Sequence, residues 1–168
     1  MTVPEITSHS VAVEVYLAST IIRGMLMTKH ERLSDHVLMR AGDEVFSVHN
    51  SKVEDLNGQP LRFGGAEYVI HMDEVLFIAD SNGEPGPERS NLDHTQIARE
   101  SKNVVMLVSP FWVRGQVHLL PGATVQNLLT VKSRFIPVTE ATLLGRPEAK
   151  PCTFLVNRTK IACVAATD

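Results

Sequence analysis

The strongest constraint on how this chain folds is an internal repeat. Residues 13–26 align with residues 104–117 at a constant offset of 91 positions. Later in each half, residues 68–78 align with residues 154–164 at an offset of 86, because turn-rich stretches between the two blocks differ in length. Self-similarity at a fixed period indicates repeated structural units, so the sequence predicts two copies of one module.

A stretch rich in proline, glycine and charge separates the two copies. Residues 80–90 read Asp-Ser-Asn-Gly-Glu-Pro-Gly-Pro-Glu-Arg-Ser, which continues neither a strand nor a helix. We therefore expect a first module over residues 1–80 and a second over residues 102–168. The linker between them, residues 81–101, is expected to include a short helix with Asp93 as its N-cap.

Within a module the hydrophobic pattern is mostly that of strands. Apolar residues alternate with polar ones in segments such as 13–17 and 46–48, as in half-buried antiparallel strands. Leu33 to Met39 is the exception and predicts a short helix, with a second one near Leu128. A module of this size removes its sheet edges best by closing, so we expect a mostly β fold of two tandem small antiparallel β-barrels, closed or partly open, each with a short helix.

The end of each module resembles the Sm-like small β-barrel, whose last two strands flank a polar turn containing arginine or asparagine. Residues 156–161 (Val-Asn-Arg-Thr-Lys-Ile) are closer to this pattern than residues 70–75, and Asn157 and Arg158 supply the polar turn. Residues 32–35 (Arg-Leu-Ser-Asp) are also similar to a signature of an uncharacterised bacterial family of small β-modules. The usual turn glycine is absent, so the resemblance implies an Sm-like or SH3-like fold more directly than RNA binding.

The composition bounds the class of protein. With 168 residues, 43% of them hydrophobic and 21% charged, the chain can bury a core and is not intrinsically disordered. No apolar run approaches the roughly 18 residues of a membrane span, and residues 1–10 lack the order of a signal peptide. These features predict a cytoplasmic protein.

Motifs for catalysis and metal binding are missing from the sequence. There is no G-x-S-x-G, P-loop, G-x-G-x-x-G or H-E-x-x-H motif, and the seven histidines are scattered. The two cysteines, Cys152 and Cys163, are expected to be reduced core residues, opposite one another if Asn157 and Arg158 form a two-residue turn. We therefore expect a protein that is not an enzyme and holds no cofactor or metal.

The candidate contact surface is the outer face of the second strand in each module. Neighbouring strand residues face opposite sides, so the glycines of the two Arg-Gly pairs are expected to face the core and the arginines the outside. Trp112 shares the outer face with Arg114. Packing of one module on the other, contact between subunits, or stacking of bases on the tryptophan would each explain this face. The candidate binding or interface residues are Arg23, Trp112, Arg114, Asn157 and Arg158.

The two modules carry opposite charges. Residues 11–80 hold six Lys or Arg and eleven Asp or Glu, a net charge of -5, whereas residues 102–168 hold eight and three, a net charge of +5. Such modules either remain solvated, dock on each other, or attract another copy into a head-to-tail ring or filament.

The sequence therefore predicts a non-catalytic assembly or protein-binding module, present as a homo-oligomer or with a protein partner. The alternative is an Sm-like nucleic-acid-binding protein that uses the basic second module. A small-molecule or metal-responsive sensor also stays open. Steep loss of binding with salt would indicate nucleic acid, whereas an apolar subunit contact would not show it.

Overall fold

The computed structural model describes residues 8–29, 32–40, 42–63, 67–81, 98–146 and 149–168. Most of the predicted linker, including the proposed N-cap Asp93, lies outside these residues. Its last two positions, Glu100 and Ser101, belong to a strand rather than to a helix or linker.

Each half contains five strands in the same order along the chain, and the first half has one additional short strand. The elements of the first half are β1 (His9–Tyr16), β2 (Thr20–Thr28), α1 (Leu33–Met39), β3 (Val45–Asp55), β4 (Pro60–Leu61), β5 (Glu67–His71), the 3-10 helix η1 (Met72–Glu74) and β6 (Phe77–Asp80). Those of the second half are β7 (Glu100–Val108), β8 (Phe111–Leu119), the 3-10 helix η2 (Val125–Leu129), β9 (Phe135–Leu143), β10 (Cys152–Asn157), the 3-10 helix η3 (Arg158–Lys160) and β11 (Cys163–Ala166). None of the described helices is long and apolar enough to cross a membrane.

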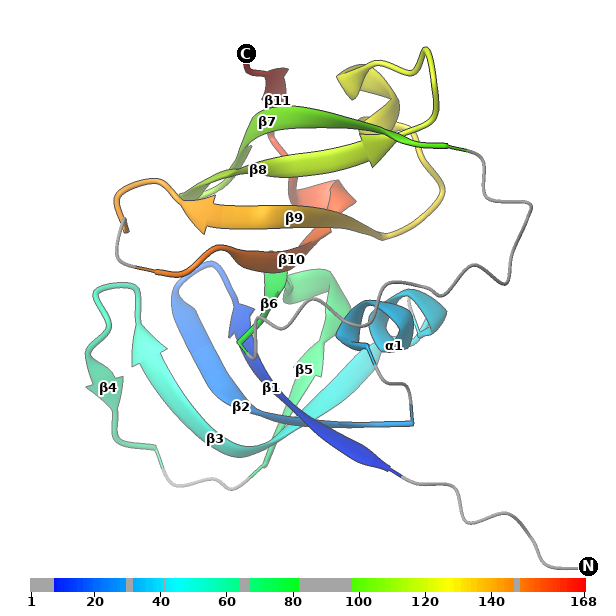
Figure 1. Cartoon of the computed structure of the whole chain (residues 1–168). Coiled ribbons are helices and arrows are strands. Elements are labelled where there is room, and N and C mark those ends of the chain that lie inside the picture. Colours follow the sequence, from blue (N-terminus) through cyan, green and yellow to red (C-terminus); the bar gives the residue numbers. More distant parts are fainter. Residues whose placement is uncertain (1–7, 30–31, 41, 64–66, 82–97, 147–148) are drawn as a thin grey trace, which may run out of the picture.

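All these strands belong to one antiparallel sheet (Figure 1). Its order is β11-β7-β8-β9-β10-β6-β1-β2-β3-β4, with β5 also paired to β3. The prediction of a mostly β, antiparallel fold is confirmed, but the prediction of closed barrels is wrong, because the sheet is open. The physical reason is that β5 and β6 flank η1 without pairing with each other, and β6 instead pairs with β1 on one edge and with β10 on the other.

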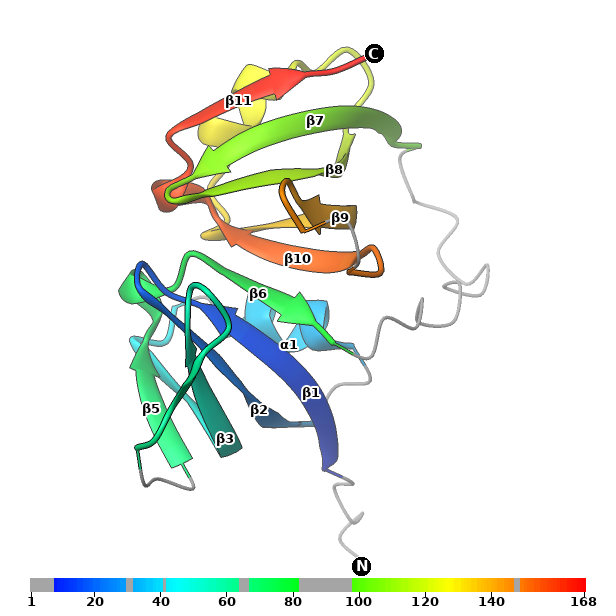
Figure 2. The same ribbon diagram turned by 90° about the vertical axis from the view of Figure 1, so that its left-hand side faces the viewer.

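The hydrophobic core crosses the junction between the halves. One cluster joins the second-half core to five buried residues of the first half, namely Tyr16, Ile21, Leu76, Phe77 and Ala79. The ring of Phe77 stacks on those of Tyr16 and Phe154, with centroid distances of 4.3 and 4.9 Å, and the Tyr16 and Phe154 centroids are 6.5 Å apart. Figure 2 shows β6 and β10 running side by side where this cluster forms. The halves are therefore two parts of one packed unit.

The two predicted helices differ. The helix at Leu33–Met39 is confirmed, and Leu33 and Val37 are buried in the apolar core, with His36 buried beside them. Its counterpart η2 is a single 3-10 segment whose start is capped, because the backbone N–H of Thr124 donates to the Asn127 side chain at 2.7 Å.

Both Arg-Gly pairs sit where the strand register shifts, and both glycines face inward as predicted. A Cβ atom on Gly115 would come within 2.6 Å of the Val138 side chain, and one on Gly24 within 2.6 Å of Val48. These positions require glycine because β3 and β9, which bulge opposite Gly24 and Gly115, approach them too closely for any side chain.

Candidate functional site

The junction between the halves is a strand pair with a buried apolar face. In it, β6 and β10 pair with Ile78 opposite Leu155 and Phe77 opposite Val156. These four side chains are no more than 1% exposed. The pair therefore joins the two halves of the chain through a buried apolar contact.

Asn157 closes this junction at the end of β10. Its side chain is fully buried, and Nδ2 donates to the carbonyl oxygens of Val75 at 2.9 Å and Met72 at 3.4 Å. Its Oδ1 atom accepts hydrogen bonds from the N–H and the hydroxyl of Thr159 at 3.2 and 2.8 Å. Asn157 thus connects the two halves through hydrogen bonds. The sequence pattern had predicted only that it belongs to a turn.

Arg158, the other residue of that predicted turn, holds its own half together. Its Nε atom donates to the carbonyl oxygen of Ser133 at 3.2 Å and its Nη1 atom to that of Leu129 at 3.0 Å. The Arg158 guanidinium is therefore engaged by main-chain acceptors.

Arg23 is also engaged, on the first-half side of the junction. Its guanidinium pairs with Glu14 at 2.5 Å and Glu54 at 3.1 Å, and the Tyr16 hydroxyl donates to Glu14 at 2.8 Å. Burial and the adjacent Glu14 carboxylate raise the pKa of Tyr16, so its hydroxyl stays protonated. This group of charges is internally satisfied.

Trp112 and Arg114 are the two candidates that remain exposed. The indole side chain of Trp112 is 43% exposed. Within the described part of the chain the Arg114 side chain, which is exposed, makes no ion pair or hydrogen bond. Of the five predicted residues, the structure therefore brings Arg23 and Asn157 to the junction and leaves Trp112 and Arg114 on the surface.

Trp112 belongs to a row of three residues that face the same side of the sheet. Trp112 lies opposite Leu107 on β7, and Leu107 lies opposite Cys163 on β11. Directly opposed residues in an antiparallel pair share a face. Because Trp112 and Cys163 are both exposed, this row is open to solvent at its two ends.

The first half contains the corresponding row, in which the same strand pairings bring together Ile21, Tyr16 and Phe77. Their exposures are 0%, 4% and 0%, because the second half packs over them. Of the three alternatives for the apolar outer strands, packing of one half on the other accounts for the Ile21 row, and the Trp112 row is left uncovered.

Three strands have an unpaired edge within the described residues. The strand β11 pairs only with β7, and both β5 and the two-residue strand β4 pair only with β3. Val69, in the middle of β5, is 64% exposed. Sequence reasoning missed this edge, although the apolar run around Val69 next to a short turn was a usable signal.

The predicted pairing of the two cysteines is wrong. Cys152 lies opposite Ala141 on β9, and Cys163 lies opposite Leu107 on β7. The cause is η3, which uses residues 158–160 as a 3-10 turn and sends β11 to β7 rather than back along β10. Cys163 is exposed rather than in a core, and Cys152 is half-buried.

The described residues contain no group of three or more His, Cys, Asp or Glu side chains that could hold a metal ion. No family model, curated protein or solved structure matches the chain. The site must therefore be interpreted from its own geometry.

Proposed function

We propose that this chain is a tandem duplication of one small Sm-like β module and that it works as a non-catalytic assembly protein. Copies join head to tail when β11 of one copy pairs with β5 of the next. The observation that carries the proposal is the β6–β10 pair, because β11 and β5 are the counterparts of these two strands in the opposite halves.

Strand pairing and chain position both support the duplication. The first half pairs its strands in the order β6-β1-β2-β3-β5, and the second half in the order β11-β7-β8-β9-β10. Both ends of β2 (Thr20–Thr28) lie 91 positions before those of β8 (Phe111–Leu119). Both ends of β6 lie 86 positions before those of β11. These are the two offsets of the sequence repeat.

The register of the proposed contact follows from that of the existing junction. Moving the pair Ile78–Leu155 by 86 positions in each strand places Val164 of one copy opposite Val69 of the next. Ile78 and Leu155 are each 1% exposed, whereas Val69 is 64% exposed. Burial of these two valines would supply apolar surface to the contact.

The row of Trp112, Leu107 and Cys163 supports the same arrangement. Its counterpart, the row of Ile21, Tyr16 and Phe77, is covered by the neighbouring module through the β6–β10 junction. A second copy seated on β11 would cover Trp112 in the same way. Large aromatic side chains are frequent anchors of such contacts.

Charge complementarity favours a second copy of this chain as the partner. The acidic first half of one copy would face the basic second half of the next. At the existing junction Arg134 pairs with Asp73 at 3.2 Å. The counterparts of these positions are Glu44, whose side chain is exposed, and Thr159, which precedes Lys160 in η3.

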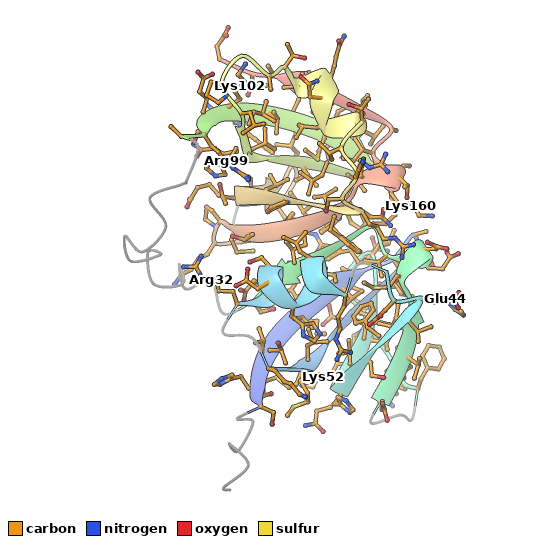
Figure 3. All side chains as sticks on the ribbon, turned by 90° about the vertical axis from the view of Figure 1, so that its right-hand side faces the viewer. Arg32, Glu44, Lys52, Arg99, Lys102 and Lys160 are labelled. Carbon is orange, nitrogen blue, oxygen red and sulfur yellow. The ribbon has the colours of Figure 1, made fainter. Side chains whose placement is uncertain are left out.

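Figure 3 shows Glu44 on the first half and Lys160 on the second half, at the same side of the molecule. Because Glu44 and Thr159 are the counterparts of Arg134 and Asp73, the proposed contact brings Glu44 of one copy close to Lys160 of the next. Neither side chain has an ion-pair partner among the described residues.

The first test is the mass of the protein in solution. Light scattering after size exclusion is expected to give a mass above that of one 18.5 kDa chain, rising with protein concentration. Val69→Lys should reduce the mass toward that of one chain without changing the circular dichroism spectrum. Leu120→Lys is the matched control, because Leu120 is 51% exposed and follows β8, at the opposite end of that strand from Trp112. A single-chain mass at micromolar concentration overturns the proposal.

A charge exchange tests the orientation of the contact. Glu44→Lys and Lys160→Glu should each weaken assembly through like-charge repulsion, and the double variant should restore it. Two weakened single variants without restoration would mean that these residues do not meet.

The fluorescence of Trp112, the single tryptophan of the chain, separates assembly from the nucleic-acid alternative. Assembly should shift its emission with protein concentration. Quenching by single-stranded RNA that disappears as salt rises would instead favour nucleic-acid binding.

A further inference from the structure

A cleft with a volume of 490 Å³ lies at the junction, on the side where β1 and β2 approach the segment between β9 and β10. This volume is in the range of small-molecule sites. Residues of both halves line it: Glu14, Tyr16, Arg23, Ala79, Asp80, Ser81, Ala141, Thr142, Leu143, Arg146, Ala149, Lys150, Pro151, Cys152 and Phe154. No role in the proposed assembly uses this cleft, which is formed within one chain.

The acidic groups in the first-half wall are already engaged. Glu14 accepts the hydrogen bond of the Tyr16 hydroxyl and pairs with Arg23, which also pairs with Glu54. Asp80 interacts with neighbouring groups as well, and together with burial and Glu14 it raises the pKa of Cys152. This wall therefore has little capacity to hold a cation.

The second-half wall carries the uncommitted charge. Arg146 donates from Nη2 to the carbonyl oxygen of Leu56 at 2.7 Å, which fixes the guanidinium while leaving its charge without a carboxylate partner among the described residues. Lys150, four positions further along, is exposed and makes no hydrogen bond or ion pair in the part of the chain that the structure describes. A guanidinium held by one hydrogen bond keeps its remaining N–H groups for an oxyanion.

Much of the rest of this wall is apolar. Leu143, Ala149, Pro151 and Phe154 line the cleft, together with Thr142 and Cys152. We propose that the cleft binds a small organic anion with an apolar body, whose oxyanion lies between Arg146 and Lys150 and whose body lies against the alanine, proline and phenylalanine side chains.

The probe for the first test is the aromatic sulfonate 8-anilinonaphthalene-1-sulfonate, and its neutral analogue N-phenyl-1-naphthylamine is the comparison. Lys150→Gln and Arg146→Gln are each expected to raise the dissociation constant of the sulfonate about ten-fold. They should leave that of the neutral analogue unchanged. The matched control is Lys132→Gln, which removes the same charge at an exposed position preceding β9, at the opposite end of that strand from Arg146. Equal affinity of the sulfonate for all three variants overturns the proposal.

The two cysteines give an independent readout in the unaltered protein. Cys152 lines the cleft, whereas Cys163 lies outside it on β11. The sulfonate should slow alkylation of Cys152 by iodoacetamide several-fold and leave Cys163 unaffected. Protection of neither thiol, or of Cys163 alone, would place the sulfonate elsewhere and contradict the site. Since assembly covers Cys163 and the cleft contains Cys152, failure of one proposal is distinguishable from failure of the other.

Discussion

Replacing Asn157 by alanine removes the polar closure of the junction. Four hydrogen bonds end on its buried side chain, two donated to carbonyl oxygens of the first half and two accepted from Thr159. A buried hydrogen bond contributes about 1 kcal/mol net, and the truncation also leaves a small cavity and buried carbonyls with fewer donors. We expect the free energy of unfolding to fall by about 2–4 kcal/mol.

The assay is urea unfolding followed by circular dichroism. Asn127→Ala is the control, because that asparagine also accepts a hydrogen bond, from the N–H of Thr124, but at an exposed position. It should cost about 1 kcal/mol or less. Asn157→Asp keeps the acceptor for Thr159 but sets a carboxylate against carbonyl oxygens, so it should recover stability as the pH falls and the introduced carboxyl group becomes protonated. A loss for Asn157→Ala no larger than that of the control would refute the assignment of this residue as the closure of the junction.

The remaining predictions concern single positions. Gly115→Ala should lower the free energy of unfolding by about 1–3 kcal/mol, because its Cβ would lie 2.6 and 2.8 Å from a side chain and a carbonyl oxygen of β9. Gly42→Ala, with nothing within 4 Å, should change it by less than about 0.5 kcal/mol in the same denaturant titration. Glu140 has a φ of 49°, so Glu140→Gly should raise the melting temperature measured by calorimetry; a lower melting temperature would show that the side chain matters more than the strain. Burial raises the pKa of the Cys152 thiol to about 11, so at pH 8 it should react with iodoacetamide more slowly than Cys163. The thiol ionises at a lower pH in the unfolded chain than in the folded one, so the free energy of unfolding should fall between about pH 9 and pH 11. Unfolding titrations over that range should show this decline relative to Cys152→Ala, and its absence would contradict the prediction.

The sequence was sufficient for the local structure of each half. Alternation predicted the strands, the Leu33–Met39 pattern predicted α1, and inward glycines followed from the alternation around Arg23 and Arg114. These features depend on residues close together in the chain. Their physical causes are the periodicity of the apolar residues and the steric space around each glycine.

The arrangement of the halves could not be predicted in the same way. The strand β6 could pair with β5 and close its own half into a barrel, or pair with β10. The choice depends on contacts between residues more than 70 positions apart, such as Phe77 with Phe154. The apolar face around Ile21 and Trp112 was recognisable, but one strand pattern is compatible with a covered face and with an exposed one. The role of Asn157 was hidden for a related reason, since a polar residue beside a turn is usually solvated, whereas this one is buried by the other half.

The junction between β6 and β10 also has a consequence for stoichiometry. In the proposed head-to-tail assembly one of every two module contacts is formed inside a chain, so the assembly would contain an even number of modules, whether it closes into a ring or stays open. Its contacts would alternate between a covalently tethered kind, insensitive to dilution, and a kind that dilution dissolves. Such an assembly would lengthen and shorten by pairs of modules, and mutations could tune its reversible contacts without weakening the permanent ones.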